Sequence, residues 1–251
     1  MSRCQDQLRL PHNDAGSCTL AEPAAVSRPA SPAATSWRLA VETVAVTVGA
    51  IAAIRFFCSR DASNIQWFLI PCVLVIAALV PTWIARREFP PLGFRADRLR
   101  LALTMLLLTC LATLPAVYVG LRLLALWGLP IPLRPVLAEG QDWTTWLLYQ
   151  FLYVAAAEEV FFRGYVQANA TRWLDEHRLS PPAQRWIAIG ISAACFAAAH
   201  VAVQGQIGSV LTFLPGLLMA WLFARTGSLL APILFHGLAN VSYGIMAATF
   251  A

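Results

Sequence analysis

The chain has 251 residues, of which 59% are hydrophobic and only 12% are charged. A typical soluble domain is about 45–50% apolar and about 25% charged, so this composition excludes an ordinary cytosolic enzyme and a disordered chain. The net charge of +5 comes from 18 basic residues, all arginine, which lie between long apolar runs. Such a distribution indicates membrane topology, and we expect no nucleic-acid partner.

Residues 1–36 are rich in proline, alanine and serine and are expected to form a flexible cytoplasmic tail. Several apolar stretches follow this tail, and each is close to the length of about 20 residues that a helix needs to span a bilayer. They predict an all-α, polytopic transmembrane bundle, with N-terminal transmembrane helices in 37–143 and a separate core in 144–251. The seven expected spans are 37–57, 65–84, 99–127, 144–166, 185–203, 210–224 and 229–248.

The arginines predict an orientation, because loops rich in arginine stay in the cytoplasm. Four segments carry most of them, and the alternate loops carry few. We therefore expect a cytoplasmic N-terminus, and the arginine-, alanine- and tryptophan-rich composition favours a bacterial inner (plasma) membrane. The arginines concerned are Arg3, Arg9, Arg28 and Arg38 in the tail, Arg86, Arg87, Arg95, Arg98 and Arg100 after the second span, Arg172, Arg178 and Arg185 after the fourth, and Arg225 after the sixth.

The fourth span contains the sequence Ala-Ala-Ala-Glu158-Glu159-Val-Phe-Phe-Arg163-Gly164. An ionisable side chain at the bilayer centre costs about 2.5–3.5 kcal/mol on insertion scales, so such residues are usually functional. Glu159 and Arg163 have the i, i+4 spacing of a helical ion pair, with the acid first. Glu158 points about 100° away around the helix, so we expect it to remain outside that pair. A helix that ends at Glu158 is the alternative, but the apolar run continues to Val166. Glu158, Glu159 and Arg163 are the three charged residues that we expect inside a span.

Two later spans each carry a polar pair. Phe196 and His200 are one turn apart on an alanine-rich face, where small residues let helices approach closely. His200 by itself is equally well explained as a packing residue or as a catalytic one. His236 and Asn240 have i, i+4 spacing, which places both side chains on one face about 6 Å apart. Their alternative role is an interhelical hydrogen-bond clamp, worth about 0.6 kcal/mol on average in membranes.

These three patterns resemble the signature motifs of the CPBP family. That family comprises CAAX prenyl endopeptidases of the Ras-converting-enzyme type and bacteriocin-processing or abortive-infection proteins. The resemblance covers residues 144–248 and implies an all-helical core with a conical cavity that opens toward the cytoplasm. It also implies intramembrane proteolysis near the C-terminus of a substrate. The motifs are Glu158-Glu159-x-x-x-Arg163, Phe196-x-x-x-His200 and His236-x-x-x-Asn240.

The same resemblance implies a role for each motif residue. Glu158 would activate water with the help of His200, and two further side chains, His236 and Asn240, would stabilise the oxyanion. The remaining motif residues, Glu159, Arg163 and Phe196, would shape the site.

A zinc enzyme is the alternative mechanism. Glu158, His200 and His236 match the ligand count of a His2Glu zinc site, in which water takes the fourth position. However, the sequence lacks an H-E-x-x-H motif, and Asn240 suits an oxyanion donor better than a zinc ligand. We therefore expect a metal-free glutamic mechanism without a cofactor, with zinc as the possible exception.

The resemblance implies a membrane-anchored protein or peptide as substrate, met within the lipid bilayer. In bacterial relatives, proteins with C-terminal sorting signals are one candidate class. A non-enzymatic membrane immunity or peptide-binding protein of the same family is the alternative function. A proton-relaying transporter is disfavoured, because the sequence shows no inverted repeat and no broken helices.

Overall fold

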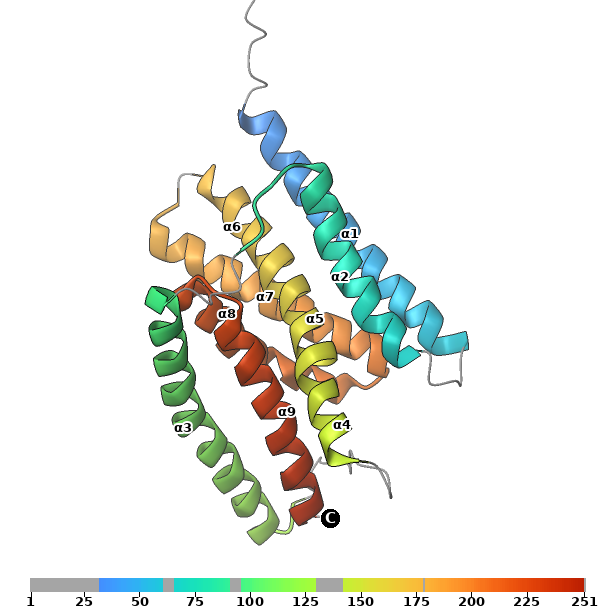
Figure 1. The fold of residues 1–251 in the computed structure, drawn as a ribbon, viewed down its shortest axis with the longest axis vertical. Helices are drawn as coiled ribbons and strands as arrows, with labels where there is room; N and C mark the ends of the chain where they lie inside the picture. The colour runs from blue at the N-terminus through green and yellow to red at the C-terminus, as the bar shows by residue number, and fades with distance from the viewer. Residues whose placement is uncertain (1–31, 61–65, 91–95, 130–141, 178, 251) are drawn as a thin grey trace, which may run out of the picture. The chain divides into compact units, whose positions relative to one another are not determined.

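The computed structural model describes residues 32–60, 66–90, 96–129, 142–177 and 179–250. All regular elements in these ranges are helices (Figure 1), which confirms the predicted all-α membrane bundle. The expected flexible tail lies outside the described residues up to 31. The first helix begins at Pro32, five residues before the start at Trp37 that the sequence predicted.

Three helices precede the core segment: α1 (Pro32–Arg60), α2 (Gln66–Ile84) and α3 (Ala96–Leu126). A continuous helical run follows, which we call the central helix; it consists of α4 (Trp143–Leu148), η1 (Tyr149–Ala155), α5 (Ala156–Glu159), η2 (Val160–Gln167) and α6 (Ala168–Asp175). The remaining elements are α7 (Pro181–Gln204), the 3-10 helix η3 (Ile207–Thr212), α8 (Phe213–Thr226) and α9 (Leu230–Phe250).

By length and composition, five helices in the described ranges can cross a membrane. They are α1, α3, α7, η3 together with α8, and α9, while α2 contributes a shorter apolar stretch, Phe68–Ile84. The central helix is divided by changes of helix type into shorter elements. The count of seven spans remains a prediction.

Local sequence explains where several helices begin and end. The central helix begins after Asp142, whose Oδ2 accepts hydrogen bonds from the hydroxyl (2.7 Å) and backbone N–H (2.8 Å) of Thr145. These bonds lower the pKa of the Asp142 carboxyl. Helix α7 starts at Pro181, where a fixed φ suits the first turn and no N–H is needed. Its end is a left-handed Gly205 with φ +68°, a conformation that glycine adopts without a steric penalty.

The central helix contains two π-helical segments, η1 and η2, which the sequence pattern did not indicate. π-Helical turns are rare in proteins, and those that do occur are frequently found at functional sites. Seven residues of η2, from Phe161 to Gln167, are buried. The carbonyl oxygen of Phe162 accepts a hydrogen bond from Ser192 Oγ of α7 at 2.9 Å. The widened turn is thus stabilised by a neighbouring helix.

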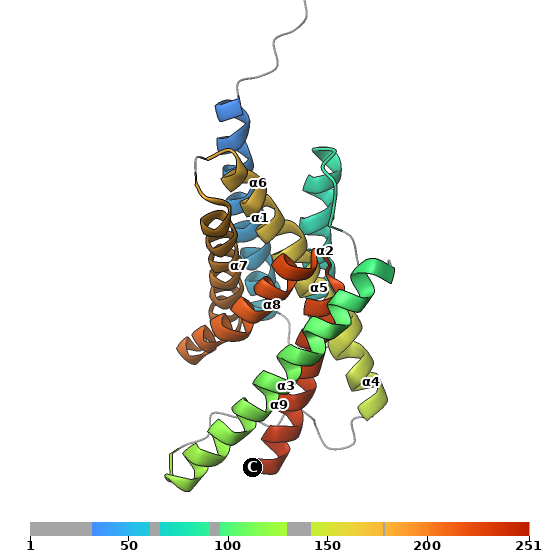
Figure 2. The ribbon, with the colours of Figure 1, turned by 90° about the vertical axis from the view of Figure 1, so that its left-hand side faces the viewer.

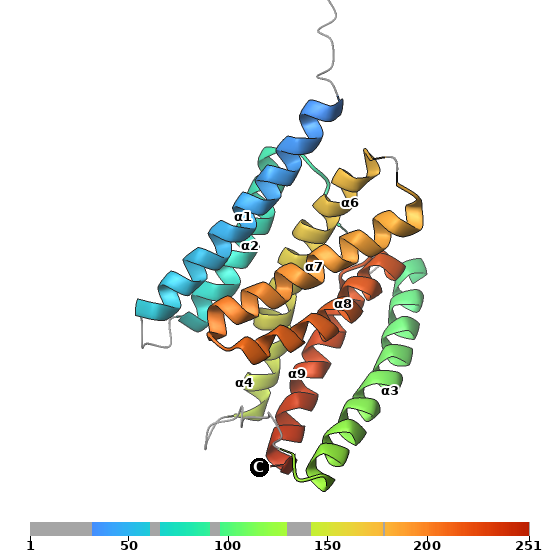
Figure 3. The same cartoon turned by 180° about the vertical axis from the view of Figure 1, so that it is seen from behind.

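The central helix lies between α9 and the α1–α2 pair (Figure 1) and also contacts α7 and α8. Helix α3 packs against α8 and α9 (Figure 2). Helices α7 and α8 pack against each other and lie toward the viewer in Figure 3. The buried apolar core follows the central helix and its neighbours. It includes Phe161, Phe162, Tyr165, Val166, Phe196, Met219, Leu222 and Phe235. The core therefore surrounds the segment that carries the two glutamates.

The prediction that only three charges lie inside spans was wrong. Glu42 and Arg55 lie within α1, and Arg122 lies within α3. Glu42 forms an ion pair with Arg87 and accepts a hydrogen bond from Tyr165 Oη at 3.0 Å. The sequence contains no local signal for this cluster, because the partners of Glu42 are 45 and 123 residues away.

Candidate active site

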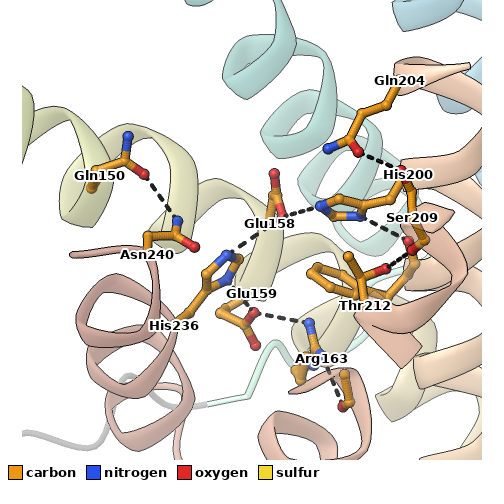
Figure 4. Close-up of polar contacts among 12 residues, drawn as sticks. Gln150, Glu158, Glu159, Arg163, His200, Gln204, Ser209, Thr212, His236 and Asn240 are labelled. Atoms are coloured by element: carbon orange, nitrogen blue, oxygen red, sulfur yellow. Dashed lines mark hydrogen bonds and ion pairs between the residues drawn. The ribbon is translucent and has the colours of Figure 1, made fainter. Parts of the chain in front are cut away.

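The structure brings Glu158 of α5, His200 of α7 and His236 of α9 together (Figure 4). Glu158 Oε2 lies 3.9 Å from His200 Nε2 and 3.8 Å from His236 Nε2. Both distances exceed a direct hydrogen bond. Among the described residues, this buried oxygen has no hydrogen-bond partner. One carboxylate oxygen thus faces two imidazole nitrogens that come from two other helices.

Glu159 and Arg163 form the predicted ion pair, with Nη1 and Oε1 2.8 Å apart and both side chains fully buried. Arg163 Nη2 also donates to the carbonyl oxygen of Gly216 at 3.0 Å. Its guanidinium carbon lies 4.7 Å from the centre of the Phe196 ring. A buried ion pair is tolerated when further hydrogen bonds compensate for lost hydration. The Gly216 carbonyl supplies one such bond, while Arg163 Nε and Glu159 Oε2 have no hydrogen-bond partner among the described residues.

The hydrogen bonds of the two histidines determine which ring nitrogen carries hydrogen. His236 Nδ1 lies 2.8 Å from Glu159 Oε1, and His200 Nδ1 lies 2.9 Å from the carbonyl oxygen of Phe196. Both partners are acceptors, so each Nδ1 is the protonated nitrogen. In the neutral rings, each Nε2 facing Glu158 is therefore a proton acceptor. Glu159 holds the His236 ring as a buried carboxylate holds the histidine of a catalytic triad.

Phe196 is buried beneath the two histidines. Its ring centre lies 4.3 Å from that of His200 and 5.8 Å from that of His236. It also packs edge-on against Phe162 at 5.1 Å. One aromatic ring therefore contacts both imidazoles and the central helix.

Asn240 lies one turn after His236 on α9 and forms its hydrogen bond outside the group around Glu158. Its Nδ2 donates to Gln150 Oε1 at 2.9 Å, and both side chains are half-buried. Gln150 was not among the site residues expected from the sequence. A single carboxamide within the apolar run 147–153 is the signal that was present.

A second polar chain, also missed from sequence, lies beside His200 (Figure 4). Ser209 Oγ of η3 donates to Gln204 Oε1 at 2.5 Å, and Thr212 Oγ1 donates to the carbonyl oxygen of Ser209 at 2.7 Å. Gln204 follows His200 by one helical turn. These bonds tie the end of α7 to the connection that leads into α8.

Gly237 sets the distance between α9 and the central helix, and we expect Gly237→Ala to impair the protein. A Cβ atom there would lie 2.3 Å from Phe151 Cδ1, so either the Phe151 ring or the two helices would have to move. Overpacking of this kind costs about 1–3 kcal/mol of unfolding free energy. His236 directly precedes Gly237, and Gln150 directly precedes Phe151. A shift at this contact should therefore displace both residues and lower activity as well. Thermal unfolding and cleavage assays measure both effects.

Gly190→Ala is the matched control, since a Cβ at Gly190 of α7 meets no atom within 4 Å. Alanine is the better helix former, so this variant should be at least as stable as the parent. Equal stability of the two variants would contradict the packing argument.

The described residues contain no group of three His, Cys, Asp or Glu side chains placed to hold a metal ion. Glu158, His200 and His236 nevertheless have the chemistry of zinc ligands, and the absence of a cofactor stays a prediction. Two cavities, of about 620 and 350 Å³, are lined by other residues, among them Trp83 and Arg87 in the first and Gln184 in the second. The conical cavity that the resemblance implies stays a prediction.

Comparison with known proteins gives one match. Residues 140–242 match a family model described as type II CAAX prenyl endopeptidase Rce1-like. No curated protein and no solved structure matches the chain. The matched segment contains Glu158, Glu159, Arg163, Phe196, His200, His236 and Asn240. Together with the long apolar helices, this match identifies an integral membrane protein. Over residues 140–242, the chain is therefore similar to the Rce1-like family of type II CAAX prenyl endopeptidases.

Proposed function

We propose that this protein is an intramembrane endopeptidase that cleaves near the C-terminus of a membrane-associated protein or peptide. The observation that carries the proposal is the contact between Glu158 Oε2 and the Nε2 atoms of His200 and His236. A half-buried carboxylate whose Oε2 atom faces two proton acceptors is an arrangement suited to moving protons during hydrolysis. The family match supports the same reaction class.

In the proposed mechanism, the Glu158 carboxylate accepts a proton from water as the water oxygen attacks the scissile carbonyl carbon. The proton then passes to the leaving amine nitrogen, either from Glu158 or through His200 Nε2. The peptide C–N bond breaks, and Glu158 returns to its ionised form. General acid–base catalysis of this kind contributes about 10²–10⁴-fold to a rate.

The oxyanion of the tetrahedral intermediate is stabilised by His236 and Asn240 in this mechanism. For His236 Nε2 to donate a hydrogen bond, the ring takes up a second proton from solvent before the attack, and Glu159 beside Nδ1 compensates for that positive charge. Asn240 Nδ2 has two N–H groups, of which one is used by Gln150. Each preorganised donor is worth about 2.7–4 kcal/mol of transition-state stabilisation.

The direct test is a cleavage assay with the full-length protein reconstituted in liposomes. Synthetic peptides with a C-terminal Cys-a-a-X sequence, with and without a prenyl group, are one substrate set. Peptides with an apolar C-terminal sorting helix are the second set, and mass spectrometry reads the cleavage site. We expect release of a C-terminal fragment from membrane-bound peptides of one set. Intact peptides in both sets would contradict the proposal.

Chelation tests the proposed metal-free mechanism. We expect that treatment with EDTA and 1,10-phenanthroline leaves the cleavage rate within about twofold, because no step above requires a metal-bound water. Elemental analysis of the purified protein provides the independent measurement. Loss of activity in chelator, with recovery on adding zinc, would instead assign Glu158, His200 and His236 as zinc ligands.

We also propose that the N-terminus faces the cytoplasm of a bacterial cell. Helix α1 begins at the end of the bundle where α2 and α6 end (Figure 1). Arg38, Arg87 and Arg172 belong to these helix ends. Arginine at one end of a bundle favours the cytoplasmic side of the membrane.

A further inference from the structure

Gln150 is a polar residue beside the site, and the mechanism above gives it no role in the chemistry. We propose that Gln150 is a positioning residue that holds the carboxamide of Asn240 in its catalytic orientation. The inference rests on the proposed function and concerns the same site.

The pair is formed by two helices that approach closely at this level. Gln150 lies in η1, eight residues before Glu158 on the central helix, and Asn240 lies one turn after His236 on α9. The bond between Asn240 Nδ2 and Gln150 Oε1 is 2.9 Å long. In Figure 4 the pair lies on the side of Glu158 opposite His200.

Packing next to the pair fixes the distance between the two residues. Phe151, the neighbour of Gln150, contacts Gly237, where even a methyl group would overlap the ring. Gly237 in turn follows His236. The backbone positions of both carboxamides are therefore set by the same glycine contact that positions His236.

A carboxamide has a donor end and an acceptor end of nearly equal size, so packing alone does not decide which end faces the reacting atoms. In the structure Gln150 presents its Oε1 atom to Asn240, and an oxygen in that place accepts only from the Asn240 amide nitrogen. The second N–H of Asn240 Nδ2 is then left for the oxyanion. An oxyanion donor is effective when it needs no reorientation during the reaction, and Gln150 supplies that restraint.

The expected result for Gln150→Met is a fall in kcat of about 10- to 100-fold, as expected for a misplaced catalytic group. KM should change by less than about threefold, because the bond acts on the oxyanion and not on substrate binding. Methionine keeps the length and volume of the side chain but removes the acceptor oxygen. Gln204→Met, which removes the carboxamide that bonds Ser209, is the matched control and should leave kcat within about twofold.

A double-mutant cycle separates positioning from simple packing. Because Gln150 acts through Asn240, Gln150→Met should cause little further loss of kcat in an Asn240→Ala background. If the double variant instead shows the product of the two single fold-losses in kcat, the residues act independently and the inference is overturned. If Gln150→Met does not fold, Gln150→Glu is the second variant. It keeps an acceptor oxygen for the Asn240 amide, so kcat should stay close to that of the parent, and a loss of about 10-fold would overturn the inference.

The outcome for Glu158→Gln distinguishes this inference from the proposed function. An active Glu158→Gln protein would reject both proposals. An inactive Glu158→Gln protein with independent effects of Gln150 and Asn240 would reject only the positioning role.

Discussion

Replacing Glu158 with glutamine is expected to lower the cleavage rate by about 10²–10⁴-fold, the contribution of a general base. Glutamine has the same shape but accepts no proton at neutral pH. Its effect on stability should be small, because Glu158 Oε2 has no hydrogen-bond partner among the described residues. The assay is the liposome cleavage reaction, with thermal unfolding measured on the same preparation.

The matched control is Glu88→Gln, the same change at an exposed glutamate in the connection after α2. It should leave the cleavage rate and the stability within experimental error. Glu158→Gln should also retain bound, uncut substrate that mass spectrometry can identify. Undiminished function of Glu158→Gln would instead favour a non-enzymatic peptide-binding protein.

Residue pairs within one helix were predictable from the sequence. The Glu159–Arg163 ion pair follows from i, i+4 spacing and is present at 2.8 Å. The separation of Glu158 from that pair follows from the same geometry, since adjacent residues point in different directions. His236 faces the two glutamates because its span carries polar groups that lipid does not tolerate.

Contacts between distant segments were not predictable in this way. Gln150 and Asn240 are 90 residues apart, and neither sequence context specifies the other. Glu42 of α1 pairs with Arg87 of the connection after α2, so this ion pair depends on how α1 and α2 pack. The π-helical segments depend likewise on neighbouring helices, as the bond from Ser192 to the Phe162 carbonyl shows.

Arg163→Met removes the basic member of the buried Glu159–Arg163 ion pair. We expect it to destabilise the protein by about 3–5 kcal/mol. The substitution leaves the Glu159 carboxylate buried with His236 Nδ1 as its one remaining partner among the described residues. The Gly216 carbonyl also loses its donor. Unfolding in detergent by heat or SDS measures the loss. Arg185→Met, at an exposed arginine of α7, is the control and should change stability by less than about 0.5 kcal/mol.

The double variant Glu159→Gln with Arg163→Met removes the stranded charge as well as its partner. Replacing both members of a buried pair is less costly than removing one, so we expect this variant to recover much of the lost stability. It should not recover activity, since a neutral carboxamide in place of the Glu159 carboxylate no longer compensates for the charge on protonated His236. A stable but inactive double variant would show that the pair positions the histidine. Equal instability of the single and double variants would show instead that Arg163 stabilises the bundle chiefly through Gly216 and Phe196.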